Sequence, residues 1–137
     1  QQGLQTLRQL GFAFLDISYH NKKANEIKDV KKHEKEILGR IQFLGDYPEN
    51  CTSTAFSHIF QGGYSAGYYS YKWAEVLDAD AFELFLEKGV FDLETSKSFK
   101  ENILSKGGTQ HPMKLYKKFR GKAPDPIALL KRAGLIP

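Results

Sequence analysis

The 137 residues include only one cysteine, Cys51, so the chain cannot form an internal disulfide. Because free thiols persist in reducing compartments, we expect a cytoplasmic protein. No apolar run approaches the roughly 18 residues that suggest a membrane-spanning helix. The stretch from Gln1 to Leu10 is polar and periodic, which does not fit a signal peptide. We therefore expect no membrane partner.

Charge of one sign is not strongly in excess. The 20 Lys and Arg residues against 16 Asp and Glu give a net charge of +4. Nucleic-acid-binding domains gather basic residues on one surface beside a recognised module. The basic runs here, at Lys31-Lys32 and from Lys114 to Lys118, fit the solvated faces of helices. We expect no nucleic-acid partner; the opposite view would require a DNA affinity that falls steeply with salt.

The alternation of apolar and polar residues that marks β-strands is also absent, and we find no internal repeat. Apolar residues instead recur at steps of three and four, as on one face of a helix. The first such set is Leu4, Leu7, Leu10, Phe14 and Ile17. The second set predicts a helix from about Asn25 to Phe43 and comprises Ile27, Val30, Ile37 and Ile41.

Start and stop signals place the remaining helices. A loop is expected over residues 45–50, followed by a short apolar segment, 54–60, before Gln61-Gly62-Gly63. A long helix is predicted from about Tyr64 or Ser65 to Lys88, ended by Gly89, with a core side made of Trp73, Val76, Leu77, Leu84 and Phe85. Further helices are predicted from Asp92 to Leu104, from Pro112 to about Arg120, and from Asp125-Pro126 to Gly134. The prediction is an all-α fold, a bundle of about five or six helices in one helical segment over 1–137.

The stretch from Phe56 to Glu75 contains the residues that could take part in catalysis or binding. Tyr64, Tyr68 and Tyr71 stand at i, i+4 and i+7, which on a helix would place three phenols on one face. Gly62-Gly63 allows close approach and unusual torsions of the backbone. A phenol beside such a loop could donate a hydrogen bond to a developing oxyanion, and His58 could add another donor. Spacing alone favours a plainer interpretation, in which the tyrosines cap a core and bond to nearby backbone.

The run His58…Gly62-Gly63-Tyr64…Tyr68-Tyr69…Tyr71-Lys72-Trp73-Ala74-Glu75-Val76 resembles the C-terminal active-site motif of the thimet oligopeptidase family. Within that family it is nearest to the bacterial oligopeptidase A and dipeptidyl carboxypeptidase pattern. The resemblance continues through residues 77–82, 102–108, 119–124 and 128–130, and more loosely through 7–10 and 15–16. It therefore covers essentially the whole chain and is most specific from Phe56 to Phe82.

The resemblance implies a zinc-dependent peptidase of short peptides, in which this segment forms the wall opposite the zinc helix. By resemblance, Tyr64 and Tyr71 are catalytic and hydrogen-bond the substrate carbonyl as it becomes an oxyanion. His58 would contact the substrate backbone, and Tyr68 would line the same wall. Gly62-Gly63 would form a flexible loop over the substrate.

The zinc helix itself is missing from this sequence. Two zinc-binding histidines should stand four residues apart, but Ala24 follows His20 and Ile37 follows His33 at that spacing. We therefore expect no metal-binding residue and no bound cofactor in this chain, with zinc belonging to the parent enzyme. The leading hypothesis is a fragment: the C-terminal part of the catalytic domain, inactive alone, whose partner is the missing catalytic part of the same enzyme.

Two further expectations concern surfaces. Apolar faces near residues 4–14 or 58–71 would be left uncovered in such a fragment, so we expect self-association through them. The alternative is a standalone module that binds peptides without cutting them.

The remaining notable residues have structural interpretations. We expect Cys51 to be a semi-buried thiol and His111 a helix cap. Glu75 and Asp78 could form a carboxylate pair on one helix, but a solvated face or a salt bridge with Lys72 is the expected interpretation. Residues 120–122, Arg-Gly-Lys, are expected to close the C-terminal helices together.

Overall fold

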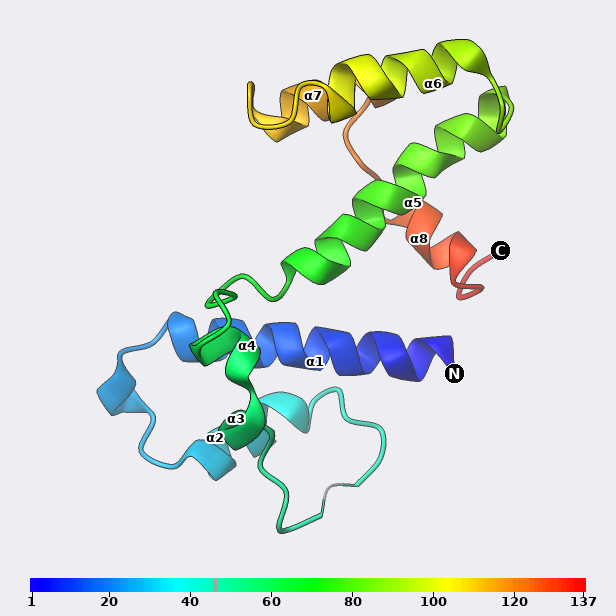
Figure 1. The fold of residues 1–137 in the computed structure, drawn as a ribbon. Helices are drawn as coiled ribbons and strands as arrows, with labels where there is room; N and C mark the ends of the chain where they lie inside the picture. The colour runs from blue at the N-terminus through cyan, green and yellow to red at the C-terminus, as the bar shows by residue number, and fades with distance from the viewer. Residues whose placement is uncertain (46) are drawn as a thin grey trace. The chain divides into compact units, whose positions relative to one another are not determined.

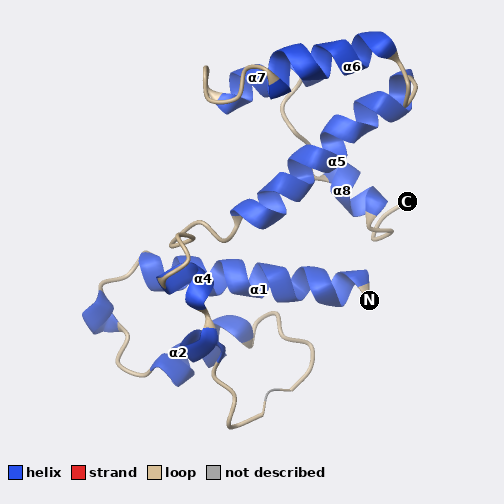
Figure 2. Ribbon diagram, in the orientation of Figure 1, coloured by secondary structure: helices blue, strands red, loops and turns tan. Residues whose placement is uncertain are grey.

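The computed structural model describes residues 1–45 and 47–137. Every regular element within those ranges is a helix and none is a strand, which confirms the predicted all-α class (Figure 2). The chain divides into two compact units, Gln1–Trp73 and Ala74–Pro137. None of the described helices is long and apolar enough to cross a membrane. The predicted loop at 45–50 is irregular where it is described, and its Asp46 lies outside the described residues.

The first unit is built on one long helix, α1 (Gln2–His20), with α2 (Val30–Leu38), α3 (Thr52–Ala55) and α4 (Ser57–Phe60) gathered along it (Figure 1). The prediction of a second helix over 25–43 was too long, because Ala24–Glu26 forms a separate 3₁₀ turn, η1. Helix α2 begins only after Asp29, whose side chain accepts the Lys32 N–H at 2.9 Å, and it ends at Gly39.

The core of the first unit differs from the predicted face of α1. Four members of that face are exposed, namely Leu4, Leu7, Phe14 and Ile17. The buried cluster consists instead of Ala13, Leu15, Phe56, Ile59 and Tyr68. A side chain at Gly11 would lie 3.2 Å from Leu38 and 3.1 Å from Ile41, so this glycine allows their close approach to α1.

Helix α5 (Ser70–Lys88) begins later than predicted. Residues 64–69 form turns, and Ala66 has a positive φ of 56°, which no α-helix contains. Trp73 is 44% exposed and was wrongly assigned to the core side, whereas Val76 is buried. Gly89 follows the helix with a φ of +115°, and its N–H donates to the Phe85 carbonyl, which agrees with the predicted stop.

The second unit follows the predicted start signals closely. It contains α6 (Leu93–Phe99), continued by a π-helical turn, η2 (Lys100–Leu104), then α7 (Pro112–Arg120) and α8 (Ile127–Arg132). The Asp92 carboxylate accepts the Thr95 N–H at 2.7 Å. The His111 ring accepts the Met113 N–H at 3.2 Å, which confirms the expected cap. The aromatic part of this unit's core comes from Phe85, Phe99 and Phe119, whose rings contact one another.

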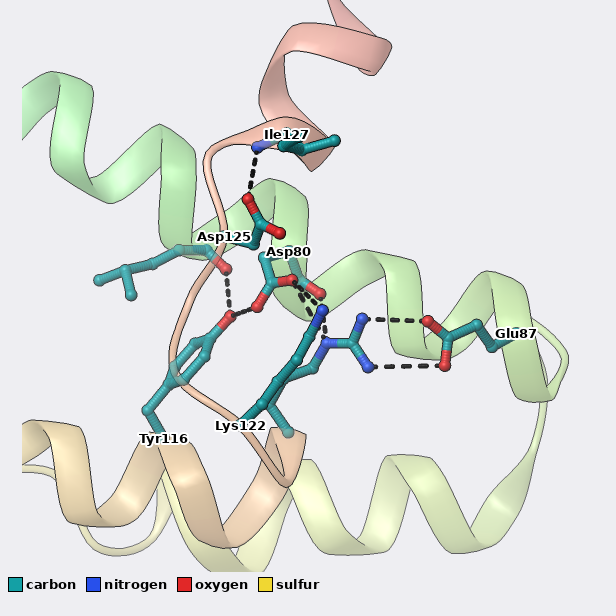
Figure 3. Close-up of polar contacts among 8 residues, drawn as sticks. Asp80, Glu87, Tyr116, Lys122, Asp125 and Ile127 are labelled. Atoms are coloured by element: carbon teal, nitrogen blue, oxygen red, sulfur yellow. Dashed lines mark hydrogen bonds and ion pairs between the residues drawn. The ribbon is translucent and has the colours of Figure 1, made fainter. Parts of the chain in front are cut away.

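A buried aspartate joins α7 to α5 within the second unit. Asp80 is 1% exposed and accepts a hydrogen bond from the Tyr116 hydroxyl at 2.6 Å. Arg120 and Lys122 also approach its carboxylate, at 3.5 and 3.7 Å. Figure 3 shows Tyr116 and Lys122 converging on Asp80. The Arg120 guanidinium also forms an ion pair with the Glu87 carboxylate at 3.0 Å. This arrangement agrees with the closure expected of residues 120–122.

Candidate functional site

The segment from α4 to the start of α5 reverses direction at the glycine pair. The Tyr64 N–H donates to the His58 carbonyl at 3.1 Å, and the Ser65 hydroxyl donates to the Ile59 carbonyl at 2.6 Å. A Cβ at Gly62 would lie 2.9 Å from the His58 Cα, and Gly63 has a φ of +80°. The pair thus allows both the close approach and the unusual torsion that the sequence indicated.

The reversal brings together the four ring-bearing residues that sequence reasoning selected, His58, Tyr64, Tyr68 and Tyr71, which we call the tyrosine cluster. The Tyr64 and Tyr71 rings are stacked with centroids 5.1 Å apart. Tyr68 lies 5.0 Å from Tyr71, and His58 lies 6.1 Å from Tyr64 and 6.0 Å from Tyr68. Their grouping was predicted, but the predicted reason, one helical face shared by the three tyrosines, was wrong because Tyr71 is the only one of the three that lies on a helix.

The tyrosines of the cluster have different environments. Tyr68 is 9% exposed, packs on Phe56, and donates its hydroxyl proton to Gln9 Oε1 at 3.1 Å. Burial raises the pKa of Tyr68, although nearby Arg8 opposes the shift. Tyr71 is 41% exposed, and its hydrogen bond with Tyr64 is the main reason that its pKa is raised. Both phenols therefore keep their protons at neutral pH, with Tyr71 the one open to solvent.

One residue of the site was not selected from the sequence. Asp16 of α1 is fully buried, and its two carboxylate oxygens accept the N–H groups of Ala66 at 2.9 Å and Tyr68 at 2.8 Å. His20 Nδ1 lies 2.8 Å from the same carboxylate. A signal was available, because Asp16 is the only charged residue between Gly11 and Tyr19, and a buried carboxylate requires partners.

An apolar groove of about 610 Å³ lies beside the cluster in the first unit. His58 and Tyr68 form part of its wall. Most of the remaining wall is aliphatic or aromatic and includes Leu4, Leu7, Phe12, Leu38, Ile41, Phe43, Leu44 and Phe56. The groove therefore combines a mainly apolar lining with a few polar groups, as small-ligand sites commonly do.

The His33-Glu34 pair, which begins like a zinc motif, is used for structure. His33 Nε2 lies 2.9 Å from the Ser18 hydroxyl. The Glu34 carboxylate accepts the N–H groups of Thr52 at 2.8 Å and Ser53 at 2.7 Å, and the Cys51 thiol lies 3.7 Å away. Burial raises the pKa of Glu34, but the hydrogen bonds from Ser53 and Thr52 outweigh it and hold the pKa below its usual value. These contacts also account for the half-buried Cys51 that the sequence predicted.

Among residues 1–45 and 47–137, no group of three or more His, Cys, Asp or Glu side chains is arranged to hold a metal ion. The described residues therefore offer no ready set of ligands for a zinc ion. Asp78 pairs with Arg132 at 2.5 Å, a partner 54 residues away that local spacing did not indicate.

Similarity to known protein families identifies the class of this chain. Residues 1–135 match the profile of "Peptidase family M3". The chain belongs to peptidase family M3, as the resemblance had implied. Members of this family generally depend on zinc.

Named relatives agree with this assignment. The chain is 44% identical to Oligopeptidase A of Haemophilus influenzae over 99% of its length, and 42% identical to Probable cytosolic oligopeptidase A of Arabidopsis thaliana over 98%. It is 36% identical to Dipeptidyl carboxypeptidase of Escherichia coli over 98%. The match spans only 20% of the length of each of these relatives.

Proposed function

We propose that this chain is the C-terminal part of a zinc-dependent oligopeptidase that hydrolyses short peptides. It supplies hydrogen-bond donors along one wall of the active-site cleft and is inactive alone. The proposal is supported by membership of the peptidase family together with a match to only 20% of each relative's length. The zinc ion, which polarises the peptide carbonyl and activates water in such enzymes, is held by residues outside this chain.

The observation that carries the proposal is the packing of Tyr64 against Tyr71 with centroids 5.1 Å apart. Peptide hydrolysis places negative charge on the carbonyl oxygen as it becomes tetrahedral, and preorganised donors lower the free energy of that state. Tyr71 is exposed enough to reach a bound peptide, and its raised pKa keeps the donor proton in place. Tyr64 orients Tyr71 and donates beside it.

The other members of the site bind the peptide. His58 is exposed on α4 and can contact the peptide backbone. Tyr68 is buried, unlike Tyr71, and its hydroxyl donates to Gln9, so Tyr68 shapes the wall and does not act on the oxyanion. Gly62 and Gly63 form the turn above the cluster and admit the peptide closely.

Two measurements on the purified 137-residue chain test the proposal at the level of the whole segment. Elemental analysis should find no stoichiometric zinc, and a quenched fluorescent peptide should remain uncut. Stoichiometric zinc together with chelator-sensitive cleavage would overturn the view that this chain is an incomplete enzyme.

The roles of the phenols are tested in the complete enzyme that contains this segment. Tyr71→Phe and Tyr64→Phe should each lower kcat by about 10²- to 10³-fold, because each variant removes one oxyanion donor. Tyr69→Phe is the matched control, since Tyr69 is a likewise exposed tyrosine two residues away that is not a member of the tyrosine cluster. Equal kcat values for Tyr71→Phe, Tyr69→Phe and the parent enzyme would refute the assigned role.

A second candidate function, a peptide-binding module without catalysis, is favoured by the apolar groove of about 610 Å³ beside His58 and Tyr68. Calorimetric titration of the isolated chain with short peptides that carry an aromatic or aliphatic residue discriminates the two. Micromolar binding would favour the module, and absence of binding would favour the incomplete enzyme.

A further inference from the structure

We propose that Asp16 is a positioning residue for the tyrosine cluster, a role that rests on the function proposed above. Asp16 lies on α1. It acts on the rings of the tyrosine cluster indirectly, through the backbone of residues 66–68. Its carboxylate holds that backbone in the conformation from which Tyr64, Tyr68 and Tyr71 meet.

The Asp16 carboxylate binds two peptide groups at once. Asp16 Oδ1 accepts the Ala66 N–H at 2.9 Å and Oδ2 accepts the Tyr68 N–H at 2.8 Å, so both oxygens are used on either side of Gly67. His20 Nδ1 lies 2.8 Å from Oδ1 and limits rotation of the carboxylate. Charge-assisted bonds of this kind are stronger than those between neutral groups, and burial of Asp16 strengthens them further.

These hydrogen bonds maintain an unusual backbone conformation at Ala66. Ala66 is the one non-glycine residue with a positive φ among the described residues, at 56°. A side chain disfavours that region of backbone space, so such residues persist only where their surroundings hold them. The two hydrogen bonds to Asp16 lie in the turns that precede α5, and they direct the N–H groups of Ala66 and Tyr68 toward α1.

Further backbone hydrogen bonds connect residues 66–68 to the residues that carry the rings. The Gly67 N–H donates to the Tyr64 carbonyl at 2.8 Å, and the Tyr71 N–H donates to the Tyr68 carbonyl at 3.2 Å. Residues 64–71 therefore form a chain of short turns in which Asp16 holds the middle. Loss of the carboxylate should release Ala66 and Tyr68 and separate the Tyr64 and Tyr71 rings.

Glu34 offers a matched control in the same unit. It is also a buried carboxylate that accepts two adjacent backbone N–H groups, those of Thr52 and Ser53. It anchors α3 through Thr52 and Ser53, which lie before the turn that holds the tyrosine cluster. A purely structural role for both residues predicts equal effects of Asp16→Asn and Glu34→Gln on the tyrosine cluster.

The first experiment uses the 137-residue chain and two-dimensional NMR. Asp16→Asn should accelerate amide exchange at Ala66 and Tyr68 by at least tenfold and remove the ring-to-ring cross-peaks between Tyr64 and Tyr71. Glu34→Gln should accelerate exchange at Thr52 and Ser53 and leave those cross-peaks in place. Retained cross-peaks in folded Asp16→Asn would overturn the inference, whatever the activity of the protein.

The second experiment measures peptide hydrolysis by the complete enzyme at a temperature where every variant is folded. Asp16→Asn should lower kcat about 10- to 100-fold with little change in KM, since small displacements of catalytic donors have effects of that size. The double variant, Asp16→Asn with Tyr71→Phe, should lower kcat by a factor much smaller than the product of the two single-variant factors, because both substitutions act through one donor. Multiplicative effects, or a kcat for Asp16→Asn equal to that of Glu34→Gln, would refute the positioning role.

The outcomes separate the two proposals. If Tyr71→Phe leaves kcat unchanged, the proposed function fails, and the NMR result alone decides whether Asp16 organises the cluster. If Tyr71→Phe lowers kcat and Asp16→Asn does not, the proposed function stands and the inference about Asp16 fails.

Discussion

Replacement of Asp80 by alanine should weaken the second unit strongly, since it removes the carboxylate on which α5 and α7 converge. The Arg120 side chain is only 6% exposed and would lose one of its two ion pairs, keeping Glu87 at 3.0 Å. Removal of one partner from a buried ion pair typically costs about 3–5 kcal/mol. Because Arg120 retains Glu87, we expect the lower part of that range, about 3 kcal/mol.

Hydrogen–deuterium exchange of the full chain, followed by mass spectrometry of peptides from α7, measures this effect where it arises. A loss of about 3 kcal/mol corresponds to roughly a hundredfold faster exchange in the limit where exchange reports the opening equilibrium. Asp78→Ala is the matched control, because Asp78 lies on the same helix and pairs with Arg132 in solvent. That exposed pair should contribute less than about 1 kcal/mol. Similar exchange rates for the Asp78 and Asp80 variants would show that burial of the network does not govern its strength.

Three further predictions concern pH and association. Burial and the hydrogen bond to Asp80 raise the pKa of Tyr116 above 10.0, so its contribution to stability is complete below pH 10 and is lost as the pH rises above it; Tyr116→Phe should flatten the alkaline fall in melting temperature. The pKa of Glu34 is lowered below 4.5 in the fold, so its contribution is present above pH 4.5 and is lost as the pH falls below it; thermal melts of Glu34→Gln should show a smaller acid-induced loss. The exposed side chains of Leu4 and Phe14 should drive association of the isolated chain, which light scattering would detect as dimers that the double serine variant converts to monomers. A monodisperse wild-type monomer would contradict this last expectation.

Local signals in the sequence predicted the second unit well. Asp92 begins α6, His111 and Pro112 begin α7, and each of these starts depends on contacts within three residues. Capping chemistry of this range is visible in a single sequence because the partners are near neighbours. The same holds for the stop at Gly89, where a positive φ suits glycine.

The first unit was harder to predict because its decisive contacts join distant residues. The start of α5 depends on Asp16, which is 52 residues away from Tyr68. Periodicity correctly identified α1 as a helix, but it could not reveal that the buried side carries Leu15 and Asp16 while Leu4 and Phe14 are exposed. The residues selected from the sequence do lie together in the tyrosine cluster, and their roles stay predictions, while the turn that groups them could be known only from the structure.

The separation of Asp16 from residues 66–68 also has a consequence for the order of folding. Helices α1 and α5 can each begin to form from local contacts, but the turn between α4 and α5 needs the two chain segments to meet across a loop of about 50 residues. Contacts of such long range form late and slow the search for the native state. The tyrosine cluster should accordingly be among the last parts of the first unit to take shape, so a nascent or partly unfolded chain would hold intact helices without an organised site.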